Sequence, residues 1–267
     1  MFNALLVLGY FVFIVFMHNP LVLLSIYIEQ HMGIENYNLL IAVVFFSVLA
    51  IFIYFLSGRF VAYKANRKLK TVYLIVTLLL LIIHSRFMFD SNIEVIHSFE
   101  FTILAFLLFP FTQRFGAAIF FTLPFMLIDE WYQYTLLYPA YNDYFDLNDL
   151  LTDTYGCGLT MLALMISGIE GSRTTAPIYK RPEFIGLVSG VVLILLLVKT
   201  GVVAPYMSDS CANTLLVMNE RTAPEPFWRA HPTHHILYHV MNPYEGFALV
   251  SLLHLFYLGL DSFRKAQ

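Results

Sequence analysis

The feature that most constrains the fold of this chain is a series of long apolar runs along its whole length. The runs lie at about 3–28, 39–56, 69–84, 93–109, 116–138, 148–170, 184–199 and 246–262. A helix needs roughly 20 mostly apolar residues to cross the hydrocarbon core of a bilayer. The pattern therefore predicts an all-α fold, a polytopic transmembrane helical bundle of about eight spans.

The composition agrees with a membrane protein and argues against other classes. Only 12% of the 267 residues are charged, whereas soluble domains have about 25%. The formal net charge of −3 gives no indication of a nucleic-acid partner. Cys157 lies in an apolar run and Cys211 in a polar loop, which predicts neither a disulfide nor a cysteine metal site. We expect membrane lipids to surround the chain.

The first apolar run is predicted to be a retained helix rather than a signal peptide. Its sequence, "MFNALLVLGYFVFIVF", lacks a basic n-region and a small-residue cleavage site. Pro20 could kink or break this helix after His18, and Pro124 could do the same in the fifth run. No internal repeat divides the chain, so residues 1–267 are predicted to form a single membrane domain with one long extra-cytoplasmic loop at 200–245.

The distribution of lysine and arginine predicts the orientation of this domain. The connection 57–70, "SGRFVAYKANRKLK", holds five basic residues, and an eight-span topology places 11 of the 15 basic residues on this same side. Loops rich in lysine and arginine face the cytoplasm. Both termini are therefore predicted to be cytoplasmic, and the loop at 200–245 is predicted to face the outside.

Polar residues interrupt three consecutive apolar runs at a similar predicted depth, in the outer half of the membrane. In chain order they are His97, Glu100, Asp129, Glu130, Gln133, Asp149 and Asp153. Within each run, spacings of three or four residues place side chains on one helical face. A carboxylate facing lipid costs about 2.5–3.5 kcal/mol on the translocon scale. These side chains should therefore face one another, a cavity or water, and we predict a functional site where the three spans meet.

Structural roles remain open for some of the same residues. Asp146 or Asp149 could cap the sixth helix, because a carboxylate there satisfies unpaired amides and favours the helix dipole. Asp129 and Gln133 could form a polar clamp with His97 that holds two helices together, worth about 0.6–2 kcal/mol per contact.

Four short motifs, taken in order, resemble the pattern of the VanZ-like family of bacterial membrane proteins. They are "HSFEF" at 97–101, "DEWYQ" at 129–133, "FDLND" at 145–149 and "TDTYG" at 152–156. The resemblance covers about residues 93–170, less than a third of the chain. It implies a role in the cell envelope, a location in the bacterial inner membrane and functional positions within these motifs. The family is associated with resistance to the glycopeptide teicoplanin, and the resemblance implies no particular reaction.

Two positions depart from the family pattern. Asp143 stands where the family usually has a basic residue, and Asp153 stands where it usually has asparagine. The site of this chain would therefore be more acidic than the family pattern. This disfavours an arginine that holds a substrate phosphate and favours bound cations or a shared proton.

The first functional hypothesis is an enzyme or carrier that acts on an envelope lipid or glycan precursor from the outer face. Neighbouring carboxylates resist being ionised together, so one can serve as an acid while the other serves as a base. Glu100, Asp129 and Glu130 would be the acid and base candidates. His97 would shuttle the proton and Gln133 would orient the reacting groups. An oxygen-rich cluster could instead hold Mg²⁺ or Ca²⁺. No G-x-S-x-G motif supports a covalent serine mechanism.

The second hypothesis is a non-catalytic subunit, or an assembly factor, of a larger membrane protein complex. The loop at 200–245 and the aromatic-rich spans would then supply contact surface for other membrane subunits. In that case the polar cluster would be structural.

A histidine-rich stretch, "RAHPTHHILYHVMNPYEG" at 229–246, raises a third possibility. His231, His235 and His239 are four residues apart, so on a helix they would share one face that could bind Zn²⁺, Cu²⁺ or a haem iron, with His235 and His239 as the metal candidates. Pro232 would break or begin that helix. We favour an amphipathic segment at the membrane surface, and a composite metal site with Glu245 and the acidic cluster stays open.

Overall fold

The computed structural model describes residues 2–62, 66–89, 92–137, 144–172, 174–207, 214–220, 226–230 and 237–262. Most of these residues are helical, which confirms the predicted all-α class. The main helices are α1 (Phe2–Met32), α2 (Ile34–Ala62), α3 (Arg67–Phe87), α4 (His97–Thr112), α5 (Phe115–Phe120), α6 (Leu123–Tyr132), α7 (Leu147–Ile166), α8 (Pro182–Lys199) and α9 (Pro243–Leu258).

Six helices of the described residues are long and apolar enough to cross a membrane, as expected of a membrane protein: α1, α2, α3, α8, and α4 and α9 with the short turns that adjoin them. The fifth and sixth apolar runs are helical but fall outside this group. The fifth run is divided into α5, α6 and a π-helical turn (Gln133–Leu137). The sixth run forms α7, whose first half carries the polar residues of the predicted site.

The two prolines behave differently. Helix α1 runs without interruption through Pro20, so the predicted break after His18 does not occur. The fifth run does break, and Pro124 lies in the first turn of α6. Proline is tolerated there because the amides of the first turn have no partner within the helix.

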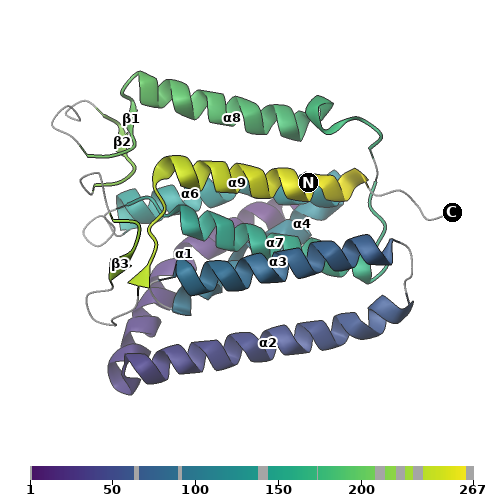
Figure 1. Ribbon diagram of the computed structural model, residues 1–267, viewed down its shortest axis with the longest axis horizontal. Coiled ribbons are helices and arrows are strands. Elements are labelled where there is room, and N and C mark those ends of the chain that lie inside the picture. Colours follow the sequence, from purple (N-terminus) through teal and green to yellow (C-terminus); the bar gives the residue numbers. More distant parts are fainter. Residues whose placement is uncertain are drawn as a thin grey trace.

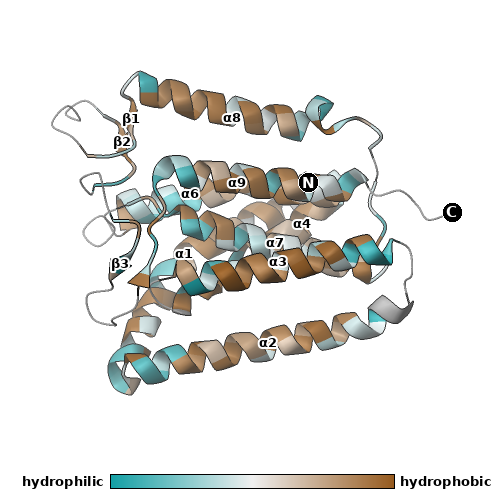
Figure 2. Ribbon diagram, viewed as in Figure 1, coloured by the Kyte–Doolittle hydropathy of each residue, from teal (hydrophilic) through white to brown (hydrophobic). Residues whose placement is uncertain are grey.

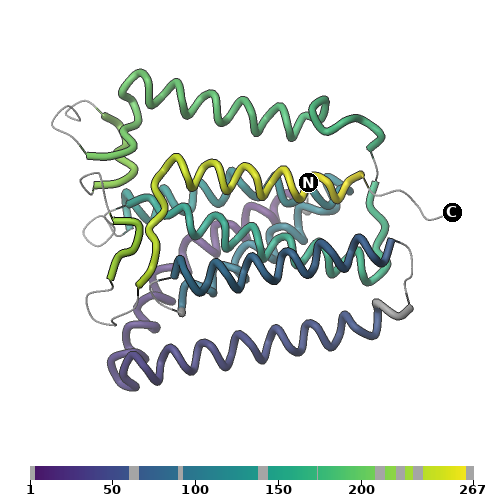
Figure 3. Tube along the Cα trace, viewed as in Figure 1, coloured from purple at the N-terminus to yellow at the C-terminus, as the bar shows by residue number. Residues whose placement is uncertain are grey.

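The helices lie side by side along the long axis of the molecule, with α8 and α2 at opposite edges (Figure 1). Apolar residues cover the middle of the helices, and hydrophilic residues gather toward both ends (Figure 2). Following the tube from purple to yellow shows the chain passing repeatedly between these two ends (Figure 3). Helix α7 lies in the interior: most of its residues are buried, and it packs against α3, α4 and α9.

Helices α4 and α7 approach each other unusually closely. A Cβ atom added at Gly156 of α7 would lie 1.7 Å from the carbonyl oxygen of Ser98 in α4. One residue further along α7, the Cys157 thiol lies 3.3 Å from the carbonyl oxygen of Phe101 and donates to it. Glycine is therefore required at 156 for the two helices to meet, and this contact positions the polar residues they carry.

Short strands lie at one end of the bundle, within the segment predicted as a long loop (Figure 1). Strand β1 (Val203–Ala204) pairs in parallel with β2 (Leu216–Val217), and β3 (Arg229–Ala230) pairs antiparallel with β4 (Leu237–Tyr238). The hydroxyl of Tyr134 donates to the carbonyl of Val217 at 2.7 Å. The strands therefore pack against the end of the bundle at which α6 finishes and α7 begins.

The opposite end of the bundle is held by basic side chains. Arg181 donates to the carbonyl of Leu258 at 2.8 Å. Lys70 donates to the carbonyl of Met165 at 2.7 Å. Arg114 forms an ion pair with the buried Glu183. These contacts join α3, α5, α7, α8 and α9 at the end away from the strands.

Candidate functional site

The predicted site residues all lie in the described part of the chain, and four elements carry them. Helix α4 carries His97 and Glu100, α6 carries Asp129 and Glu130, Gln133 begins the π-helical turn, and α7 carries Asp149 and Asp153. They lie on the halves of these helices nearest the strands. Each side chain is buried or largely buried.

His97 is the residue that joins α4 to α7. Its Nδ1 atom lies 3.2 Å from Oε2 of Glu100, one turn further along α4. Its Nε2 atom lies 3.4 Å from Oδ2 of Asp149 in α7. The imidazole therefore lies between two carboxylates, one from its own helix and one from α7.

Asp129 and Asp153 are deeply buried, with 2% and 3% of their surface exposed. Gln133 donates to Oδ2 of Asp129 at 2.9 Å, as their spacing of four residues predicted. The other oxygen of Asp129 and the Oδ1 atom of Asp153 have no hydrogen-bond partner among the described residues. A buried carboxylate oxygen without a partner is costly, so these two atoms are where a ligand would be accommodated.

Glu130 has a different environment from its neighbour Asp129. Its Oε1 atom accepts a hydrogen bond from the backbone amide of Asp146 at 2.6 Å. Asp146 in turn caps α7, since its Oδ1 atom accepts from the amide of Asn148 at 2.8 Å. The cap predicted for Asp146 is confirmed. Successive residues of a helix point about 100° apart, so Glu130 holds the start of α7 while Asp129 turns toward the cluster.

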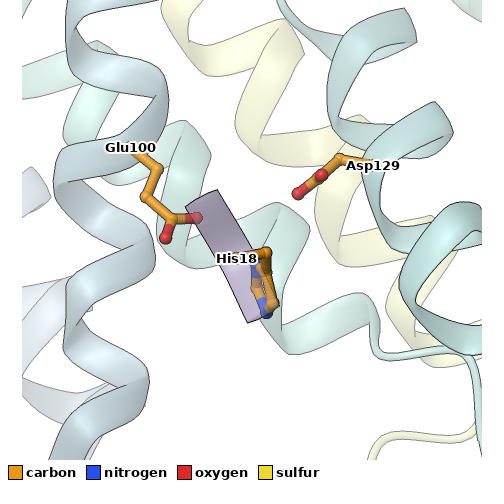
Figure 4. A group of neighbouring side chains, drawn as sticks. All are labelled: His18, Glu100 and Asp129. Atoms are coloured by element: carbon orange, nitrogen blue, oxygen red, sulfur yellow. The ribbon is translucent and has the colours of Figure 1, made fainter. Parts of the chain in front are cut away.

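The structure adds one residue that sequence spacing did not place in the site, His18 of α1. Its ring centroid lies 5.7 Å from that of His97. Figure 4 shows His18, Glu100 and Asp129 converging from three helices, and one potential ligand atom from each lies within 4.8 Å of the others. The available signal was the presence of an ionisable side chain in the middle of an apolar run. Its helix is distant in sequence from the three others, so spacing could not connect it to them.

A second triad shares Glu100 with the first. His97, Glu100 and Asp153 each offer one atom, and these atoms also lie within 4.8 Å of one another. Imidazole nitrogens and carboxylate oxygens are common ligands of divalent transition metals. The cluster therefore has the donor atoms that a metal centre requires.

An apolar groove of about 270 Å³ adjoins the cluster. Aliphatic side chains of α1, α2 and the turn η1 (Asn92–Ile96) form most of its wall. His18, His97 and Glu100 also line it. The arrangement places an apolar surface directly beside a buried acidic and imidazole surface, which suits an amphipathic molecule.

The histidine-rich stretch is only partly within the described residues. His231, His234 and the metal candidate His235 lie outside them. Residues 237–238 form β4 rather than a helix. The metal candidate His239 lies 2.6 Å from the carbonyl oxygen of Phe227 through Nδ1 and 2.9 Å from Glu245 through Nε2. His239 thus joins the segment around β3 to the first turn of α9, and metal binding at these histidines stays a prediction.

No protein-family model, curated protein or solved structure matches the chain. Its function is therefore inferred from the residues of the site and their geometry.

Proposed function

We propose that this chain is a VanZ-like protein of the bacterial inner membrane that binds an envelope lipid or a lipid-linked glycan precursor and acts on its polar head. The observation that carries the proposal is the junction between the apolar groove and the buried acidic and histidine cluster. An acyl or polyprenyl chain would occupy the groove, and the polar head would reach His18, His97 and Glu100. Binding sites of this kind are largely apolar, with a few polar groups that orient the ligand.

The cluster supplies groups that can move a proton. His97 lies between Glu100 and Asp149, so its imidazole can pass a proton from one carboxylate to the other. Asp129 faces the cluster, and its Oδ1 atom has no hydrogen-bond partner among the described residues. We assign acid and base roles to Glu100 and Asp129, a shuttle role to His97 and an orienting role to Gln133. Glu130 is assigned a positioning role, because its oxygen holds the backbone of Asp146.

The proposal includes eight spans with both termini in the cytoplasm. The basic contacts of Lys70, Arg114 and Arg181 lie at the end of the bundle away from the strands. Basic segments favour the cytoplasmic side. The site lies toward the opposite end and would therefore open to the periplasm, where envelope precursors are used.

Blocking the groove tests the proposal. Val22 lines the groove, whereas the adjacent Leu23 of α1 is exposed and points elsewhere. The protein is placed in nanodiscs that contain either a diazirine-bearing phosphatidylglycerol or a diazirine-bearing undecaprenyl phosphate. We expect Val22→Trp to reduce photo-cross-linking at the groove several-fold, while Leu23→Trp leaves it at the wild-type level.

The two probes distinguish a general lipid from a glycan carrier. Preferential labelling by the polyprenyl phosphate assigns the glycan-precursor substrate, and preferential labelling by phosphatidylglycerol assigns an envelope lipid. Equal labelling of the wild type, Val22→Trp and Leu23→Trp with both probes would contradict the proposal.

The runner-up function is a non-catalytic subunit or assembly factor of a larger membrane protein complex. It is favoured by a second apolar pocket, of about 390 Å³, between the edge helix α8 and α9, where another membrane subunit could pack. The double variant Asp129→Asn with Glu130→Gln separates the two functions. If the double variant accumulates and assembles normally but loses teicoplanin tolerance, the result supports a functional site at the cluster. If it no longer assembles, the result supports the role as a subunit or assembly factor.

A further inference from the structure

We infer that the cluster around Glu100 is a transition-metal centre, in which Glu100 is the common ligand of two triads. The first triad is His18, Glu100 and Asp129, and the second is His97, Glu100 and Asp153. The inference deepens the proposed function and rests on it for the use of the metal. With a metal bound, Glu100, Asp129 and His97 serve as ligands, in place of the acid, base and shuttle roles assigned to them in the metal-free site. Metal binding itself has a separate readout.

The geometry of the triads is close to that of a ligand set. Atoms that bind one ion at about 2.0–2.2 Å are separated from each other by roughly 3–4.4 Å. The potential ligand atoms of each triad lie within 4.8 Å of one another. Figure 4 shows that Glu100 and Asp129 extend from their helices toward the His18 ring. Small side-chain rotations would bring all three onto one ion.

In the second triad, two potential ligand atoms already lie at a distance expected for two ligands of the same ion. His97 Nδ1 and Glu100 Oε2 are 3.2 Å apart. The opposite ring nitrogen, Nε2, faces the carboxylate of Asp149 at 3.4 Å. Metal-binding histidines usually donate their other ring N–H to a carboxylate or carbonyl, which fixes the ring and its tautomer. Asp149 is in the position to accept this hydrogen bond from His97. Gln133 donates a hydrogen bond to Asp129 and so orients that carboxylate.

A bound cation would also balance the charge of the cluster. The carboxylates of Glu100, Asp129, Asp149 and Asp153 are packed together, and no lysine or arginine of the described segments forms an ion pair with them. Burying ionised carboxylates without a compensating charge is strongly unfavourable. The His97 imidazole contacts two of the four. Asp129 and Asp153 each keep a buried oxygen without a partner among the described residues, and each belongs to one triad.

The donor atoms indicate the class of metal. Ca²⁺ and Mg²⁺, the ions that the sequence suggested for an oxygen-rich cluster, prefer oxygen ligands throughout. One imidazole nitrogen in each triad favours Zn²⁺, Mn²⁺, Fe²⁺ or Co²⁺ instead. The histidine in each triad, His18 or His97, therefore changes the expected ion from that of an all-oxygen cluster.

The test measures metal bound by the full chain in nanodiscs. The protein is stripped with a chelator, incubated with Zn²⁺ or Mn²⁺, desalted and analysed by inductively coupled plasma mass spectrometry. Wild-type protein should retain ions, with one equivalent for each triad filled. Glu100→Gln should lose them all, whereas Asp129→Asn and Asp153→Asn should each lose one triad and keep the other. Glu35→Gln is the matched control, because Glu35 is an exposed carboxylate at the start of α2.

Two results would overturn the inference: a wild-type protein that retains no Zn²⁺ or Mn²⁺, or a Glu100→Gln protein that retains as much as Glu35→Gln. The visible d–d spectrum of Co²⁺ added to wild-type protein reports nitrogen and oxygen ligation without any variant, so a misfolded variant does not decide the outcome. Retained metal without lipid cross-linking supports the metal centre and refutes the proposed function. Lipid cross-linking without retained metal supports the proposed function and refutes the metal centre.

Discussion

Replacing Gly156 with alanine tests whether the contact between α4 and α7 holds the site together. The new Cβ atom would lie 1.7 Å from the carbonyl oxygen of Ser98 and 2.6 Å from its carbonyl carbon. Ordinary contact begins near 3.4 Å, so the two helices would have to separate by about 1.7 Å. The obstacle is backbone, which cannot rotate away as a side chain could.

The expected loss of stability follows from this overlap. Overpacking a close-packed interior costs about 1–3 kcal/mol and occasionally more. Because the obstacle at Gly156 is backbone, we expect a cost at the upper end of this range. Alanine recovers about 0.8–1 kcal/mol of helix propensity. The net loss of about 2 kcal/mol corresponds to a fall of roughly 4–8 °C in Tm for a chain of this size. The same separation would carry His97 Nε2 and Asp149 Oδ2, now 3.4 Å apart, beyond ion-pair distance.

Thermal unfolding in detergent, followed by fluorescence-detected size exclusion, measures this effect. Gly190→Ala is the matched control, since it also lies within a helix but has no atom within 4 Å of its added Cβ. We expect the control to unfold at or slightly above the wild-type temperature. A Gly156→Ala protein as stable as Gly190→Ala would refute the close α4–α7 contact and the placement of the site that depends on it.

Two further substitutions test how the bundle is held at its two ends. Arg114→Leu leaves Glu183, only 1% exposed, without its ion-pair partner, and should cost about 3–5 kcal/mol of unfolding free energy. The double variant Arg114→Leu with Glu183→Leu should recover most of that loss, and a double variant no more stable than the single one would exclude this account. Asp146→Ala removes the cap of α7 and should cost about 0.5–2 kcal/mol, whereas Asp146→Asn should cost much less. Equal Tm values for the two would argue against the cap.

Local spacing was enough to predict several features of this protein. The length and repetition of apolar runs predicted a helical membrane protein, because a bilayer requires about 20 apolar residues per helical span. Helical periodicity predicted that Glu100 would lie beside His97 and that Gln133 would lie beside Asp129, and both contacts occur. The cap at Asp146 followed from its place before an apolar helix.

Only the tertiary structure decided how these helical faces meet. Periodicity gives the face of a helix on which a residue lies, but the rotation and separation of helices depend on packing between distant segments. The close approach at Gly156, the turning of Glu130 away from Asp129 and the arrival of His18 from α1 are outcomes of that packing. The sequence alone therefore determined which polar residues lie within the apolar core. The fold determined that Glu100 stands between two histidines, because that requires contacts among helices far apart in the chain.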